Sequence, residues 1–85
     1  MKIQKDNIAC NLSMLRQFNK FSQEEVAEKI GVSRQSVAKW ESGESVPDIF
    51  NCDALAQLYN VELKDLIYHD QKKTGMSIAP KGKHI

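Results

Sequence analysis

The chain has 85 residues, of which 41% are hydrophobic and 27% are charged, and its formal net charge is +1. That length and composition predict one small domain with a single helical core. The two cysteines, Cys10 and Cys52, are isolated and lack neighbouring ligand spacing, which argues against a structural metal or a disulfide-stapled secreted scaffold. We expect both to be small core residues, and we expect no metal or cofactor.

Two further classes of protein fit the sequence poorly. The N-terminal segment soon turns polar and the longest apolar runs are too short to span a membrane, so we expect a cytoplasmic protein without membrane contact. The histidines, His69 and His84, lie near or in the C-terminal tail, and no Cys-His, Ser-His or paired-carboxylate spacing appears. We therefore expect no enzymatic activity.

Residues 23–42 predict two short helices packed across a tight turn. Apolar side chains recur at the spacing that faces them inward, at Val26, Ile30, Val32, Val37 and Trp40. Ala27 is small enough for the second helix to cross closely. Gly31 supplies the left-handed backbone that ends the first helix.

Capping residues predict the same helix boundaries independently of the apolar spacing. Ser22 and Glu25 have the spacing of a capping box at the start of the first helix. Ser33 is the expected N-cap of the second helix, which Gly43 ends. An ordinary helical hairpin would explain these caps, but it would not explain the polar residues that begin the second helix.

Those polar residues predict a surface that contacts DNA. Arginine pairs with guanine and glutamine with adenine through two hydrogen bonds each, so Arg34 and Gln35 are the leading candidates for reading bases, and Lys39 is a third. No acidic residue occurs between Ser33 and Glu41 to repel phosphates. Short hydroxyls and helix N-termini suit phosphates better, and the candidates for that contact are Ser22, Gln23, Ser33, Ser36 and Ser42.

The segment resembles the lambda-repressor-like (XRE/Cro/C1-type) helix-turn-helix family of DNA-binding regulators. The resemblance runs from about Asp6 to Tyr68, roughly three quarters of the chain, and implies an all-α, compact five-helix domain. The first helix would carry Ile8, Leu12 and Leu15 at helical spacing. The residues from Gly43 to Asp48 are similar to the family's loop, with Asp48 capping the fourth helix, and residues 61–67 are similar to its closing helix. The fourth helix would have an apolar stripe at Ile49, Cys52, Leu55, Ala56 and Tyr59.

The resemblance also implies an ion pair between Arg16 of the first helix and Glu41 near the end of the recognition helix. Trp40, beside Glu41, is expected to pack in the core rather than to stack on nucleic acid, because it belongs to the apolar set. Glu62 replaces the usual small polar cap of the last helix, so that helix is expected to fray or to start one residue later.

The charge of the chain divides unevenly along its length. Residues 1–69, the expected DNA-binding domain, hold eight Lys or Arg and ten Asp or Glu, a net of −2. Residues 70–85 hold four lysines and one aspartate, a net of +3, and their composition predicts a flexible basic tail. The lysines of that tail, at positions 72, 73, 81 and 83, would add nonspecific attraction to phosphates. Alternatively, the tail would bind a protein partner.

The sequence therefore predicts a sequence-specific regulator of transcription, and a repressor in particular. Proteins of the family bind pseudo-palindromic operators in double-stranded DNA, which implies a homodimer. The expected dimer surface is at the last helix, namely Leu63, Leu66, Ile67 and Tyr68, unless these residues close the core instead. Two alternatives remain open: an antitoxin-type autorepressor that also binds a toxin, and a protein-interaction module that keeps the fold without reading DNA.

Overall fold

The computed structural model describes residues 5–70, and these residues form five α-helices. The helices are α1 (Lys5–Phe18), α2 (Gln23–Ile30), α3 (Arg34–Ser42), α4 (Ile49–Tyr59) and α5 (Leu63–Tyr68). Within residues 5–70 the backbone forms no strand, and the all-α prediction is confirmed.

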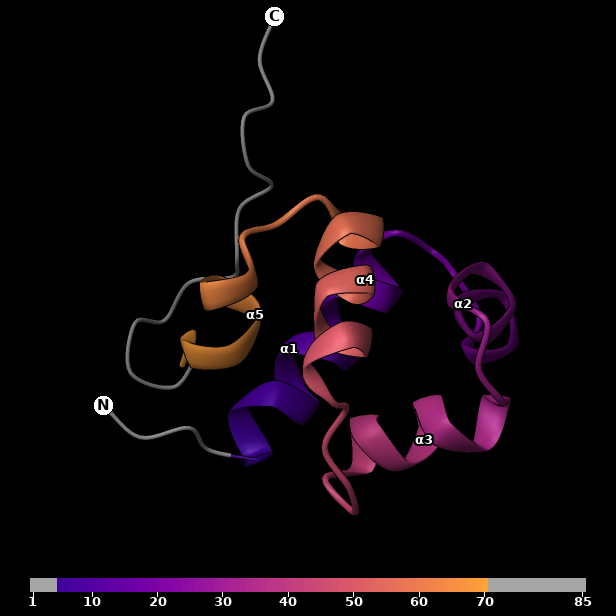
Figure 1. Ribbon diagram of the computed structural model, residues 1–85, viewed down its shortest axis with the longest axis horizontal. Helices are drawn as coiled ribbons and strands as arrows, with labels where there is room; N and C mark the ends of the chain where they lie inside the picture. The colour runs from indigo at the N-terminus through magenta and orange to yellow at the C-terminus, as the bar shows by residue number, and fades with distance from the viewer. Residues whose placement is uncertain (1–4, 71–85) are drawn as a thin grey trace, which may run out of the picture.

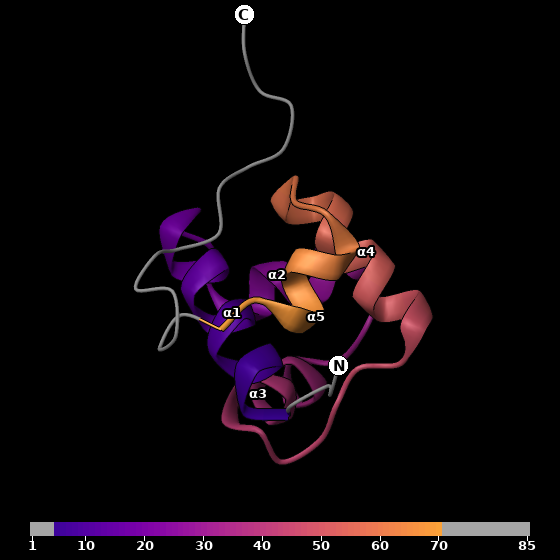
Figure 2. The same ribbon diagram turned by 90° about the vertical axis from the view of Figure 1, so that its left-hand side faces the viewer.

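The helices pack around one core (Figure 1). In that view α4 lies centrally in front of α1, while α2 is seen almost end-on and α3 crosses below it. Helix α3 packs on α1 and α2, and α5 packs on α1 and α4 (Figure 2). The arrangement leaves the side of α3 that faces away from α1 and α2 at the surface of the molecule.

The core contains most of the apolar residues that the helical spacing predicted, while Ile30 and Val32 are only partly buried against it. Its fully buried or nearly buried members are Ile8, Leu12, Leu15, Val26, Ala27, Val37, Trp40, Cys52, Leu55, Ala56, Tyr59, Val61 and Leu66. Trp40 is 7% exposed, which confirms its packing role. Cys10 is exposed and Ile49 is 56% exposed, so the prediction that they are core residues was wrong. Both lie on the predicted helices, on sides that the other helices of residues 5–70 leave exposed.

The predicted helix boundaries of α2 and α3 are confirmed by their caps. The Ser22 hydroxyl accepts from the backbone N–H of Glu25, whose carboxylate in turn accepts from the backbone N–H of Ser22. Ser33 caps α3 by accepting from the N–H of Ser36. Gly31, with φ of 77°, ends α2 in the left-handed conformation and donates its N–H to the Ala27 carbonyl at 2.9 Å.

Helix α5 differs from its predicted span. It begins at Leu63, two residues later than the family pattern implied, and it ends at Tyr68. Glu62 stands at its N-cap without a side-chain hydrogen bond. The side chain of Asn11, only 1% exposed, donates to the carbonyls of Leu66 and His69 at 3.0 and 2.9 Å. The Asn11 side chain of α1 therefore donates hydrogen bonds to carbonyl groups at the C-terminal end of α5. These bonds hold the two helices together.

Gly31→Ala tests whether the turn between α2 and α3 depends on backbone conformation alone. A Cβ built at Gly31 meets nothing within 4 Å, so no steric clash is introduced, but φ remains positive. We expect the variant to lose about 1 to 2 kcal/mol of stability in chemical denaturation. Gly31→Asn should lose less, because asparagine tolerates this conformation. Equal losses in the two variants would contradict this explanation.

Candidate nucleic-acid interface

The outer side of α3 presents the side chains that the sequence assigned to base reading. Arg34, Gln35 and Lys39 are all exposed. Gln35 and Lys39 are four positions apart and therefore lie one above the other on the same side of the helix. Val37 and Trp40 point the opposite way, into the core. The structure thus brings the three predicted base-reading residues together on one exposed surface, and we call Arg34, Gln35 and Lys39 the reading face.

The one acidic residue of α3, Glu41, has a largely buried side chain. Its carboxylate receives a hydrogen bond from Nε of Arg16 at 2.8 Å, and the side chains of Arg16 and Glu41 are 17% and 7% exposed. The implied ion pair is therefore present. The hydrogen bond to Glu41 raises the pKa of Arg16 above its ordinary value, against a smaller lowering from burial. Since Glu41 is neutralised inside the fold, the exposed charges of α3 are those of Arg34 and Lys39.

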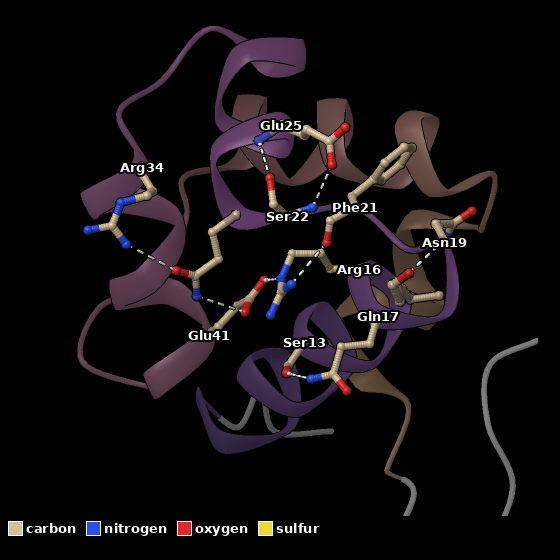
Figure 3. A network of polar contacts seen from close by, with 11 residues as sticks. Ser13, Arg16, Gln17, Asn19, Phe21, Ser22, Glu25, Arg34 and Glu41 are labelled. Carbon is tan, nitrogen blue, oxygen red and sulfur yellow. Dashed lines mark hydrogen bonds and ion pairs between the residues drawn. The ribbon is translucent and has the colours of Figure 1, made fainter.

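A chain of polar contacts links this ion pair to the reading face (Figure 3). Nε2 of Gln23, at the start of α2, donates to the second oxygen of Glu41 at 3.2 Å. Oε1 of Gln23 accepts from Nη1 of Arg34 at 3.3 Å. Arg16 also donates to the carbonyl of Phe21, just before α2, at 3.0 Å. Sequence reasoning missed the contacts of Gln23, because a hydrogen bond between residues far apart in the chain leaves no periodic signal.

The serines predicted to contact phosphates lie around the same surface, and each already has a partner within the chain. Ser22 and Ser33 accept from backbone N–H groups at the starts of α2 and α3. Accepting leaves the hydroxyl hydrogen of Ser22 able to donate. The hydroxyls of Ser33 and Ser36 are 3.0 Å apart, so one of them donates to the other. Ser42 donates its hydrogen to the carbonyl of Lys39 at 3.1 Å. Ser42 is therefore the serine least suited to donate to a phosphate.

The surface predicted for dimerisation is largely covered. Leu66 is 0% exposed and belongs to the core, so it is not accessible to a partner, which corrects the expectation for that residue. Leu63 and Ile67 are partly buried and pack against the core, while Tyr68 is 40% exposed. The domain buries more of α5 than its small size suggested, because α5 packs on both α1 and α4.

Large apolar side chains are also exposed outside α5. Val46, Ile49 and Phe50 form one such group where the loop after α3 enters α4, and Phe50 is 81% exposed. Met14 and Phe18 form a second group, one turn apart on α1. Apolar spacing places these residues on helices but does not show which side of each helix a neighbour covers.

The predictions for the C-terminal tail fall outside the described residues. The lysines at positions 72, 73, 81 and 83 all belong to this part of the chain. Within residues 5–70, no helix is long and apolar enough to cross a membrane. The same residues contain no group of His, Cys, Asp or Glu arranged to hold a metal ion.

Comparison with known proteins agrees with this geometry. A family model described as Helix-turn-helix matches residues 12–66. The HTH-type transcriptional regulator MJ0272 of Methanocaldococcus jannaschii is 32% identical over 62 residues, which are 72% of this chain and 94% of that protein. The HTH-type transcriptional activator BcrR of Enterococcus faecalis is 32% identical over 56 residues, which are 66% of this chain but only 28% of BcrR.

A solved structure shows the same fold. The P22 c2 repressor in complex with a synthetic operator aligns with a TM-score of 0.71 and 24% identity, over 74% of this chain and 96% of that one. The fold and the site define a helix-turn-helix protein. The chain belongs to the helix-turn-helix family of DNA-binding transcriptional regulators.

Removing one partner of the ion pair tests how much of the fold depends on it. Arg16→Ala leaves the Glu41 carboxylate almost fully buried without its cation, and we expect a loss of about 3 kcal/mol or more in the free energy of unfolding. Replacing both residues by apolar ones, Arg16→Met with Glu41→Leu, should recover most of that loss. Lys64→Ala, at an exposed basic residue of α5, serves as the control and should change stability by less than about 0.5 kcal/mol. An unchanged melting temperature in Arg16→Ala would contradict the structural role of the pair.

Proposed function

We propose that this protein is a sequence-specific repressor of transcription that inserts α3, capped by Ser33 and ending at Ser42, into the major groove of its operator. The observation that carries the proposal is the reading face. Its basic and amide side chains point outward, while the only acid of α3 points into the fold. Such a surface approaches phosphates without repulsion and carries the donors that distinguish base pairs. The protein acts in the cytoplasm without catalysing a reaction and without a cofactor.

The contacts divide between bases and backbone. Arg34 binds the O6 and N7 of guanine, Gln35 binds the N6 and N7 of adenine, and Lys39 extends the reading face by one turn. Ser22, Ser33 and Ser36 surround the N-termini of α2 and α3, where hydroxyl groups and helix dipoles favour phosphates. Ser42, at the opposite end of α3, is the remaining candidate for a phosphate contact. Because the exposed basic residues of this surface are few, binding depends on where they lie rather than on an overall basic field.

A homodimer follows from the small contact surface of one copy. Two copies on a pseudo-palindromic operator would place their recognition helices about 34 Å apart, on the same side of the DNA, and double the contacts. We place the dimer contact at the exposed side of α5, with Tyr68 at its centre and the partly buried Leu63 and Ile67 beside it. A protein partner for the C-terminal tail remains a separate hypothesis.

Selection of bound sequences from a random DNA pool tests base reading. For the protein without substitutions, we expect enrichment of a motif made of two half-sites related by two-fold symmetry. Arg34→Ala should weaken binding to that motif by about 1 to 3 kcal/mol and relax the preference at one position in each half-site. Gln35→Ala should relax a different position. Lys64→Ala removes an exposed charge from α5 and should leave the motif unchanged. Absence of any enriched motif at low salt would contradict the proposal.

Sedimentation at micromolar concentration tests the dimer. Tyr68→Ser should shift the protein towards the monomer, because it replaces an exposed aromatic ring of the proposed contact by a small polar side chain. Phe50→Ser is the matched comparison at an aromatic residue of α4 that is 81% exposed. If Phe50→Ser dissociates the dimer and Tyr68→Ser does not, the contact lies at the start of α4 and the proposed surface is incorrect.

A further inference from the structure

The loop after α3 and the first turn of α4 carry an exposed apolar group. Its members are Val46, Ile49 and Phe50, which are 45%, 56% and 81% exposed. Phe50 is the most exposed large apolar side chain within residues 5–70. Burying such side chains against another segment is favourable, because it removes their apolar surface from water. A group of exposed apolar residues therefore indicates a surface at which another segment docks.

Acidic side chains accompany this apolar group, and basic ones are absent from the same stretch of sequence. Residues 40–63 include no Lys or Arg. The carboxylates of Glu44, Asp48 and Asp53 are exposed, and they alternate with the apolar residues along the chain. Asp53 follows Phe50 by three positions and so lies on the same side of α4. We call these three apolar and three acidic residues the acidic–apolar surface.

The three carboxylates can each accept a hydrogen bond from a cation. Asp48 accepts from the backbone N–H of Asn51 and Asp53 accepts from Nε2 of Gln57, both at 2.8 Å and each through one oxygen. A carboxylate accepts through both of its oxygens, so these contacts do not saturate it. The ion pair between described residues is that of Arg16 with Glu41, so no described cation neutralises the acidic–apolar surface.

The C-terminal tail has the complementary composition. Residues 70–85 hold four lysines and one aspartate, a net of +3, and residues 76–79 read Met-Ser-Ile-Ala. Residues 1–69 have a net charge of −2, so the tail and the rest of the chain attract each other. The tail therefore combines the two properties that the acidic–apolar surface requires of an occupant, positive charge and bulky apolar side chains.

The length of the tail allows it to reach this surface within one chain. The tail follows α5, which packs on α4. Ile78 is eight residues beyond Asp70, the last described residue. Eight residues span at most about 27 Å, and the molecule measures 33 × 31 × 21 Å. A tethered segment also acts at an effective concentration of about 1 mM, so a contact too weak to hold a separate partner is sufficient here.

We propose that the acidic–apolar surface is the docking site of the C-terminal tail of the same chain. The ring of Phe50 contacts Met76 and Ile78, and the carboxylates pair with the lysines of the tail. The inference goes beyond the proposed function and does not depend on it. Glu44 lies at the end of α3, where its N–H donates to the carbonyl of Lys39 at 3.0 Å. The docked tail therefore neutralises a carboxylate beside the reading face.

Zero-length cross-linking of the full-length chain tests the docking. A carbodiimide joins a lysine amine to a carboxylate only where the two are in contact, and peptide mass spectrometry identifies the joined residues. We expect the lysines at positions 72, 73, 81 and 83 to couple mainly to Glu44, Asp48 and Asp53. Glu24 and Glu28, exposed acids of α2, are the reference carboxylates and should give few such couplings.

Matched aromatic variants separate docking from charge attraction alone. Phe50→Ser keeps every carboxylate of the surface and removes the exposed ring, and we expect it to lower the yield of these couplings about three- to tenfold. Phe18→Ser removes a ring that is 74% exposed on α1 and should leave the yield unchanged. Thermal melting checks that both variants are folded, and Val46→Ser takes the place of Phe50→Ser if that variant is not.

A mixture of chains with natural and heavy nitrogen identifies whose tail is bound. Couplings within chains of one label support the inference, whereas couplings between labels would show that the surface binds the tail of a second copy and would overturn it. Couplings spread equally over Glu24 and Glu28 would show that the tail is not docked. An unchanged yield in Phe50→Ser would leave charge attraction alone and remove the docking site. None of these outcomes bears on base reading, which the selection experiment tests separately.

Discussion

The burial of one carboxylate, that of Glu41, sets the geometry on which the rest of the structure depends. A charged group that is only 7% exposed requires a cation and further hydrogen bonds, and it receives them from α1 and α2. Arg16 meets Glu41 and also donates to the carbonyl of Phe21. The guanidinium of Arg16 therefore joins α1 to the segment just before α2 and to the end of α3. These contacts fix the orientation of α3 relative to α1 and α2.

The pair matters more for orientation and for surface charge than for net stability. A buried ion pair recovers in attraction roughly what it loses in desolvation, so its presence alone does not show that the fold gains free energy. Its second effect is electrostatic. The chain has a net charge of only +1, and an exposed acid on α3 would cancel one of the two basic residues that this helix presents. Turning Glu41 inward is what leaves α3 positively charged on its outer side.

The sequence predicted the local features of the fold well, since their causes lie within a few residues. The helix caps act through contacts within their own turn of helix, so their spacing in the sequence is enough to predict them. These residues are Ser22 with Glu25, Ser33 and Gly31. The exposure of Cys10 and Ile49 depends instead on which side of a helix another helix covers, and apolar spacing within one helix does not contain that information. The small size of the domain left two interpretations of Leu66 open, a dimer surface or a closing position in the core, and the packing of α5 on two helices places it in the core.

The residues of the site divide in the same way between those that the sequence predicts and those that it does not. The outward positions of Arg34, Gln35 and Lys39 follow from the apolar positions on the other side of α3, so they were predictable. The tie between Arg34 and Gln23 joins residues eleven positions apart and was not. A hydrogen bond across eleven positions depends on how α2 and α3 pack against each other, and the sequence of either helix alone does not contain that information.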